Sequence, residues 1–343
     1  MASGLLLAPF VPSDTARGGG VVYPVTRSLA QAFGSEPGPT ARRMGSFLML
    51  VGFHGNYLAS AVFLTSMVSN PLIAEFVWKI AHVRLTWLGW LAGSCVPAAL
   101  SVAVIPWLLY RLHPPEIRKT GEARRMAGDR LREMGPMSGR ERGLLAILIL
   151  VMLGWVTSPW HGIPNAFVAL AGISAQLVFR ILTWNDLIGE TKAWDALMWF
   201  APLLMMADEL NTTGVVKVVS EALFARLGGW PWGAAVAVLA LVYLYVHYGF
   251  ASMTAQVMAL YPAFLAAGLA AGAPPLAAAL PLAYFSNLNA GITHYGTGSA
   301  PVFFGAGYVG PAEWWKLGFV VSLVNVAIWL GVGMAWWKVI GLW

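Results

Sequence analysis

The stretch LGWLAGSCVPAALSVAVIPWLLY, residues 88–110, decides the class of this protein. It contains no charged side chain, and it is longer than the roughly 20 apolar residues that an α-helix needs to cross about 30 Å of hydrocarbon. Similar apolar windows recur at 163–182, 234–250 and 317–336. We therefore expect an all-α, polytopic membrane protein in which these four windows are transmembrane helices.

The composition supports this class. Of the 343 residues, 58% are hydrophobic and only 10% are charged, whereas about 25% are charged in an average soluble domain. This excludes a water-soluble globule. The 17 tryptophans often lie beside the ends of the windows, as do Trp87, Trp90, Trp314 and Trp337. We expect these rings at the membrane–water interfaces.

The net charge of +6 comes largely from one loop. Nine of the 21 lysines and arginines fall within residues 111–142, between apolar windows. Such a cluster indicates a loop on the cytoplasmic side, because positive charge is retained there during insertion. No aromatic or glycine-rich element accompanies these charges, so we do not expect a nucleic-acid partner.

A weak internal repeat points to a function. Residues 13–16 read Ser-Asp-Thr-Ala and precede Tyr23-Pro24, while residues 252–255 read Ser-Met-Thr-Ala and precede Tyr261-Pro262. Each copy is followed by a small, polar, proline-marked break in an apolar stretch, at 69–71 and at 297–301. Paired breaks in two halves are typical of secondary transporters. Tight packing of helices through small residues is the alternative interpretation.

Broken helices suit transport for a physical reason. Unwinding a helix at mid-membrane frees backbone carbonyls and amides that lipid cannot satisfy but that an ion or an anionic substrate can. Carbonyl ends attract a cation, and helix N-termini favour a carboxylate. The pattern therefore predicts a binding site for an anion and a cation where the two breaks meet.

Seven segments together carry a family resemblance: PSDTARGGGVVYP, FLTSMVSNP, KTGEARRMAGDRLREMGPMS, WDALMWFAPLLMMADELN, HYGFASMTAQVMALYPAF, SNLNAGITHYGTGSAPVFFGAGYV and EWWKLGFVVSLVN. With them the chain resembles the divalent anion:sodium symporter family, in the branch of bacterial citrate or tartrate exchangers and plastid 2-oxoglutarate/malate translocators. The resemblance implies an inverted-repeat transporter with a re-entrant hairpin and discontinuous helices. It also implies an elevator mechanism that carries di- or tricarboxylates, of the malate, 2-oxoglutarate, succinate and citrate class, by anion exchange or sodium-coupled symport.

The same resemblance divides the chain. It implies the end of a first-repeat hairpin and a broken helix over 1–34, the rest of that repeat over 44–110, the basic loop over 111–142 and a second repeat over 143–343. The second repeat would contain a hairpin over 194–227, a motif helix over 247–272 and a broken helix over 287–309. Relatives carry further helices before this point, so we expect the chain to be N-terminally truncated.

The resemblance also assigns site residues. Those expected to bind substrate are Ser13, Asp14, Thr15, Arg17, Ser69, Asn70, Ser252, Thr254, Thr297 and Gly298. Those expected to bind sodium, through backbone or side chain, are Ser13, Asp14, Val68, Tyr248, Ala251, Met253 and Gly296. Beyond Na+ as a coupling ion, no cofactor is expected.

Asp14 departs from the family, which usually has asparagine at this position. An ionised Asp14 would repel a dicarboxylate at close range. Arg17 lies one turn further on and could pair with it, either as a plain stabilising pair or as a functional unit. In the functional case Arg17 would supply the fixed positive charge that sodium provides in symporters, which would suit an exchanger.

Other functions find less support. His54, His247 and His294 have no histidine or carboxylate at metal-ligand spacing, so no transition-metal site is expected. The motifs of zinc proteases, serine hydrolases and P-loop enzymes are missing, so we do not expect an enzyme. The expected partners are small carboxylate anions, the lipid bilayer and a second copy in a homodimer of a bacterial inner membrane. A nonfunctional fragment of such a carrier and an inorganic-anion permease stay open as alternatives.

Overall fold

The computed structural model describes residues 1–118, 128–129, 131–191, 193–194, 198, 202, 205–206, 209, 212–227 and 229–343. Every regular element in these ranges is a helix. The chain forms two compact units, one made of Met1–Glu116 with Leu204–Trp343 and the other of Ile117–Leu203.

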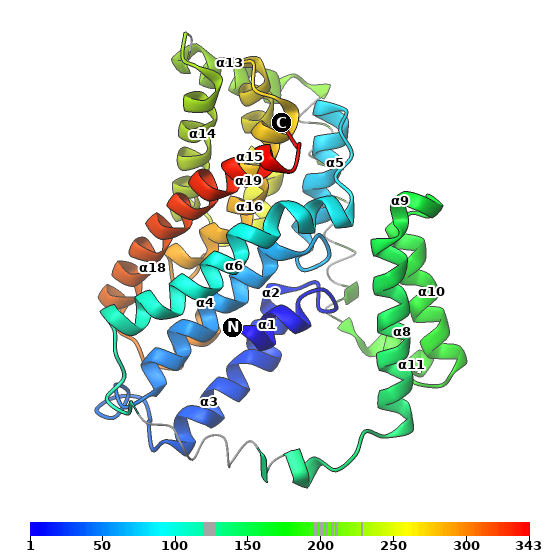
Figure 1. Ribbon diagram of the computed structural model, residues 1–343, viewed down its shortest axis with the longest axis vertical. Coiled ribbons are helices and arrows are strands. Elements are labelled where there is room, and N and C mark those ends of the chain that lie inside the picture. The colour runs from blue at the N-terminus through cyan, green and yellow to red at the C-terminus, as the bar shows by residue number, and fades with distance from the viewer. Residues whose placement is uncertain are drawn as a thin grey trace. The chain divides into compact units, whose positions relative to one another are not determined.

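The larger unit contains two runs of helices (Figure 1). The first run consists of α1 (Ala2–Leu7), α2 (Asp14–Arg17), the π-helix η1 (Gly18–Val22), α3 (Tyr23–Ala32), α4 (Gly45–Val62), α5 (Ser69–Ala81) and α6 (Trp87–Leu112). The second consists of α13 (Val215–Leu227), α14 (Trp232–Val246), η2 (His247–Gly249), α15 (Met253–Ala270), α16 (Pro275–Leu288), η3 (Asn289–Ile292), α17 (Ala300–Gly305), α18 (Pro311–Val326), η4 (Ala327–Gly333) and α19 (Met334–Val339).

Four helical stretches are long and apolar enough to cross a membrane: Trp87–Leu112, Trp232–Gly249, Met253–Ala270 and Pro311–Val339. The expectation of an all-α polytopic membrane protein is therefore confirmed. The window 163–182 differs, because its helix α10 covers only the 14 residues Asn165–Val178. At about 1.5 Å per residue this helix reaches about 21 Å, which is too short to cross alone. Arg180 follows it with a φ of 55° and prevents continuation.

The core of the larger unit is built around α4 and α16. Both helices are buried over nearly their whole length. In Figure 1, α4 lies beside α3 and α6, and α4 also contacts α16. Because these helices are enclosed by protein, the polar side chains on them, such as Asn56, Ser60 and Asn287, face other helices instead of lipid.

The first helix break lies earlier than the sequence suggested. Helix α4 ends at Val62 and α5 begins at Ser69, so residues 63–68 form the break and not the expected residues 69–71. Pro71 is the third residue of α5, a position where the N–H it lacks has no partner within the helix. In the second half, η3 ends at Ile292 and α17 begins at Ala300, so the break covers residues 293–299 and includes 297–299 of the expected 297–301.

Four of the tryptophans expected at the interfaces are instead part of the core. Trp87, Trp90, Trp314 and Trp337 are at most 2% exposed. The indole Nε1 of Trp90 donates to the Ala61 carbonyl over 2.9 Å, at the end of α4. A helix end leaves its last carbonyls without partners, so a buried indole satisfies them.

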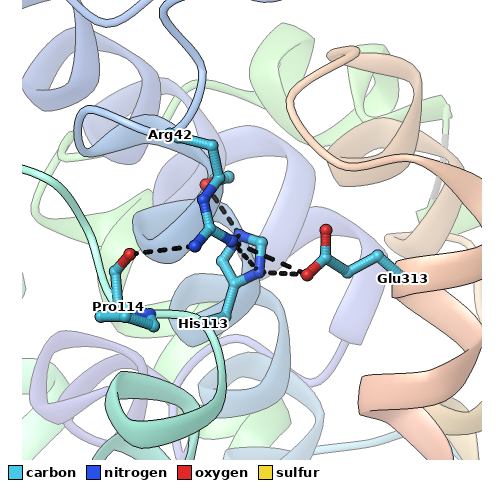
Figure 2. A network of polar contacts seen from close by, with 5 residues as sticks. Arg42, His113, Pro114 and Glu313 are labelled. Carbon is cyan, nitrogen blue, oxygen red and sulfur yellow. Dashed lines mark hydrogen bonds and ion pairs between the residues drawn. The ribbon is translucent and has the colours of Figure 1, made fainter.

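A polar network joins three segments of the larger unit where α6 ends (Figure 2). His113 is buried, with Nδ1 2.5 Å from Glu313 Oε1 and Nε2 2.9 Å from Ser46 Oγ. Arg42 contacts the imidazole and donates from Nη2 to the Pro114 carbonyl over 3.3 Å. The network therefore connects the start of α4, the end of α6 and the start of α18.

The smaller unit contains α8 (Gly139–Val156), α9 (Ser158–His161), α10 and α11 (Trp184–Gly189). Helix α8 packs against α10 and begins with a capping box between Ser138 and Glu141. Within the hairpin predicted over 194–227, α13 forms the second part. Residues 195–197, 199–201, 203–204, 207–208 and 210–211 of that hairpin, and 119–127 and 130 of the basic loop, lie outside the described residues.

Candidate functional site

The two sequence motifs begin their helices in the same way. Ser13 is the N-cap of α2, with φ −142° and ψ 118°, and its hydroxyl accepts from Ala16 N. Ser252 is the N-cap of α15, with φ −147° and ψ 125°, and its hydroxyl accepts from Ala255 N. The repeated Ser-x-Thr-Ala pattern therefore encodes one local structure twice, a serine cap at the start of a helix.

Asp14 lies at the centre of the first motif and is 1% exposed. Its Oδ2 accepts from the hydroxyls of Thr297 and Ser299, each over 2.6 Å. Its Oδ1 accepts from Asn56 Nδ2 over 2.7 Å and from Ser60 Oγ over 3.4 Å. An ionised carboxylate only accepts hydrogen bonds, and four donors surround this one. Through Asp14, the first motif is thus bound to the second helix break.

Arg17 is fully buried one turn further on, and all five of its N–H groups are used. Nε donates to Asn56 Oδ1, and Nη1 donates to the carbonyls of Val11 and Ser66. Nη2 donates to the Asn56 carbonyl and to the Ser60 hydroxyl. Each N–H has one oxygen acceptor, so in this conformation the guanidinium has no donor left for a substrate.

Asp14 and Arg17 interact through Asn56. The amide of Asn56 donates from Nδ2 to Asp14 and accepts at Oδ1 from Arg17 Nε over 3.1 Å. No direct ion pair joins the two charged groups within the described ranges. The expected pairing thus takes the form of two buried charges linked by a neutral amide, and it is locally neutral.

Next to this cluster the surface is accessible. Thr15 and Gly298 are both exposed, although Asp14 and Thr297 beside them are buried. A Cβ on Gly298 would lie 2.3 Å from Thr15 Oγ1, so only glycine permits this approach. Likewise, a Cβ on Gly18 would lie 2.4 Å from Asn56 Nδ2. The two glycines bring the first motif against the second break.

The second motif has Gln256 where the first has Arg17. Gln256 donates from Nε2 to the Tyr243 carbonyl and accepts at Oε1 from Asn289 Nδ2 over 2.8 Å. His247 lies between two oxygens, with Nδ1 2.5 Å from Gln256 Oε1 and Nε2 2.8 Å from the Gly296 carbonyl. A neutral imidazole has only one N–H, so it donates to one of these two oxygens, and the tautomer decides which one.

The other residues expected to bind substrate are placed as follows. Asn70 is buried and donates to the carbonyls of Ser60 and Phe63, while its Oδ1 accepts from Asn287 over 2.9 Å. Ser69 is buried, and its hydroxyl has no partner. Ser252 is exposed and Thr254 half-buried, and no hydrogen bond within the described residues links them to Asp14. The structure thus gathers Asp14, Thr15, Arg17, Thr297 and Gly298, and it leaves the remaining candidates around them.

The residues expected to bind sodium are more dispersed. Val68, Ala251 and Met253 lie at helix starts without a shared hydrogen-bond partner in the described part of the chain. The carbonyls of Tyr248 and Gly296 already accept from Tyr295 Oη and from His247.

The two breaks also differ in how well their oxygens are satisfied. At the end of α4, the carbonyls of residues 60–63 accept from Asn70, Trp90, Ser94 and Ser66. The first break has one buried oxygen without a partner, Ser69 Oγ, whereas the second has Asn289 Oδ1 and Thr293 Oγ1, and Asn287 Oδ1 is a further one on α16. Unpaired buried oxygens are costly, and they mark places that suit a donor or a cation.

Sequence reasoning missed several members of this site: Asn56, Ser60, Ser299 and Gln256. Asn56 and Ser60 are four residues apart in an apolar stretch, so they share one helix face, and polar residues in such a stretch usually face a site. That spacing was the available signal for them. Ser299 lies inside the predicted break, two residues after Thr297.

Comparison with known proteins gives the chain a family context. The family described as "Sodium:sulfate symporter transmembrane region" matches residues 1–343. "Putative malate transporter YflS" of Bacillus subtilis is 46% identical over 342 residues, which cover 99% of this chain and 72% of that protein. "Dicarboxylate transporter 1, chloroplastic" of Arabidopsis thaliana is 43% identical over a region that covers 98% of this chain and 61% of that protein. "L-tartrate/succinate antiporter" of Escherichia coli is 32% identical, covering 99% and 70%.

Proposed function

The chain belongs to the sodium:sulfate symporter family, and on that premise we propose that it carries dicarboxylate anions across a membrane by exchange. The relatives named above are transporters of malate, of dicarboxylates, and of tartrate and succinate. None of these names describes an enzyme, which supports the assignment to transporters. The observation that carries the proposal is the buried cluster of Asp14, Arg17 and Thr297, which joins the first motif to the second helix break.

Exchange is favoured over sodium coupling by the first break. A sodium ion there would need several free oxygen ligands, because hard cations are held by carbonyl, hydroxyl and carboxylate oxygens. Arg17 already takes the carbonyls of Val11, Asn56 and Ser66. The guanidinium thus provides a permanent positive charge where an ion would otherwise bind.

His247 supports the same proposal in the second half. The orientation of Gln256 is fixed because its Nε2 donates to the Tyr243 carbonyl, which leaves Oε1 facing the imidazole. His247 contacts Gln256 Oε1 and the Gly296 carbonyl, so both oxygens already have a partner beside the second break. With both oxygens occupied, neither is free to bind a coupling ion, so the empty carrier would return most readily with a second anion bound.

The proposal includes an assembly and a motion. We place the protein in a bacterial inner membrane as a homodimer in which one part of each chain moves as an elevator. The cytoplasmic position inferred for the basic loop 111–142 supports this orientation. The division of the chain into two compact units supports a moving part and a frame.

The test is uptake by proteoliposomes. Purified protein is reconstituted into liposomes with or without unlabelled malate inside, and entry of labelled malate is measured with and without an inward sodium gradient. We expect uptake only into malate-loaded liposomes, with no dependence on sodium, and equal uptake by a Cys95→Ser control, since Cys95 is exposed on α6 and donates only to the Ala92 carbonyl of its own helix.

Two results would contradict the proposal. Sodium-driven uptake into empty liposomes would indicate symport, and sulfate uptake without malate uptake would indicate an inorganic-anion permease. The role of Arg17 is tested separately, because sodium-independent exchange that survives Arg17→Ala would show that its charge is not needed.

A further inference from the structure

The candidate site already contains one carboxylate, the side chain of Asp14, which accepts hydrogen bonds from the second break. Thr297 and Ser299 each direct a hydroxyl to Asp14 Oδ2 over 2.6 Å. A hydroxyl has a single proton to donate. These two donors are therefore not available to the carboxylates of a substrate while Asp14 is ionised and in place.

The accessible donors lie beside Asp14. Thr15 is exposed and Ser13 is half-buried, and the Ser13 oxygen acts as an acceptor in the helix cap, so its hydroxyl proton remains free. A substrate held by these groups would lie close to Asp14, because Thr15 is its direct neighbour in the chain. Every negative charge on the substrate would then be repelled by the Asp14 carboxylate.

The surrounding charges set how strong this repulsion is. Asp14 and Arg17 are both buried, and their charges cancel each other through Asn56. The fixed charge of the site is thus small. An asparagine at position 14 would remove the negative charge and leave Arg17 uncompensated, which would favour more highly charged anions.

We propose that Asp14 is the specificity-determining residue of the site, and that its carboxylate restricts transport to anions with two carboxylates over those with three. This inference rests on the proposed function. It names Asp14 as the reason why the charge of the substrate is limited, with Thr297 and Ser299 as the groups that hold the carboxylate in position.

The experiment compares succinate and citrate in exchange assays. KM and the maximal rate are measured for both anions with the wild type, Asp14→Asn and Ser299→Ala. We expect Asp14→Asn to raise the citrate-to-succinate ratio of rate over KM by at least about tenfold. Ser299→Ala removes a hydrogen bond but no charge, so it should lower both rates and leave the ratio within about twofold of wild type.

An unchanged ratio in a folded Asp14→Asn protein would overturn the inference, and the proposed function would stand because the wild type still exchanges succinate. If Asp14→Asn does not fold, the inference is tested on the wild type by competition at two pH values. Citrate should compete with labelled succinate better at mildly acidic pH, where it loses one charge, than at mildly alkaline pH. Equal competition at both pH values would overturn the inference. If neither anion is transported and neither raises the thermal unfolding temperature, both proposals fail.

Discussion

The two Ser-x-Thr-Ala motifs fold alike but bind their surroundings differently. Their cap serines agree within about 10° in φ and ψ. Four residues after each serine, however, the first motif has Arg17 and the second has Gln256. Arg17 uses five donors on five oxygens, whereas Gln256 accepts from Asn289 and contacts His247.

The same type of helix start is therefore combined with a charged side chain in the first motif and with a neutral one in the second. In the first motif the positive charge that balances Asp14 is the guanidinium of Arg17, so no added ion is needed there. The second leaves Asn287 Oδ1, Asn289 Oδ1 and Thr293 Oγ1 without donors in the part of the chain that the structure describes. Any cation that still binds would therefore be expected near the second break and not near the first.

The largest expected effect comes from making the first motif like the second, with Arg17→Gln. Glutamine cannot supply the five donors, and Asp14 would remain as a buried charge without compensation. Removal of one partner from a buried charged pair costs about 3–5 kcal/mol. Thermal and denaturant unfolding in detergent would measure this loss of stability.

The double variant Asp14→Asn/Arg17→Gln provides the control for that prediction. It removes both charges, so part of the lost stability should return, and the coupling between the two positions should exceed about 0.5 kcal/mol. Additive effects of the two substitutions would show that Asp14 and Arg17 do not compensate each other.

An intermediate effect is expected from substitution of two asparagines, Asn56 beside Arg17 and Asn289 beside Gln256. Asn56→Ala removes hydrogen bonds to Asp14 and Arg17, but both charged groups keep their other partners, so we expect a loss of about 1.5–3 kcal/mol in total. Asn289→Ala removes one bond, to the neutral Gln256, and leaves fewer unpaired oxygens, so it should cost about 1 kcal/mol or less. Equal losses in the unfolding free energy would argue against the contrast between the motifs.

The smallest effect is expected at the network of Figure 2, where the charges are in direct contact near the surface instead of separated by an amide. Burial lowers the pKa of His113, and Glu313 partly opposes this shift. The unfolded chain therefore binds a proton at His113 more readily, so stability should fall as pH decreases below about 6.5.

Glu313→Gln should steepen this loss, by about 0.5–1 kcal/mol because the carboxylate is half-exposed. His113→Gln should flatten it. Unfolding temperatures measured across this pH range check both variants, and a slope that is the same in the wild type and in His113→Gln would exclude His113 as its source.

Much of the fold could be predicted from local sequence. The windows 88–110, 234–250 and 317–336 became helices of spanning length because uninterrupted apolar residues leave the backbone no other partner in lipid. The position of the first break could not be predicted in this way. Pro71 marks the start of α5. The break before it is stabilised by Asn70, Trp90 and Ser94, whose side chains donate to carbonyls at the end of α4 that lie 10 to 32 residues earlier in the sequence.

The candidate site was predictable in its motif residues but not in its partners. The prominence of Asp14, Arg17 and Thr297 followed from charged and polar residues in apolar surroundings. Their connection depends on Asn56, which lies 39 residues after Arg17 on another helix. Only the packing of α2 against α4 brings that amide between the two charges.

The glycines at the cluster limit the evolutionary routes open to the protein. Gly18 lies against Asn56 and Ser299, and Gly298 lies against Thr15, so almost any substitution at either glycine would separate the first motif from the second break. Gly20, by comparison, faces open space. Lineages that acquire a new substrate should therefore keep Gly18 and Gly298 and vary the exposed positions of the site, and a deep mutational scan should show this as two intolerant positions beside a tolerant rim.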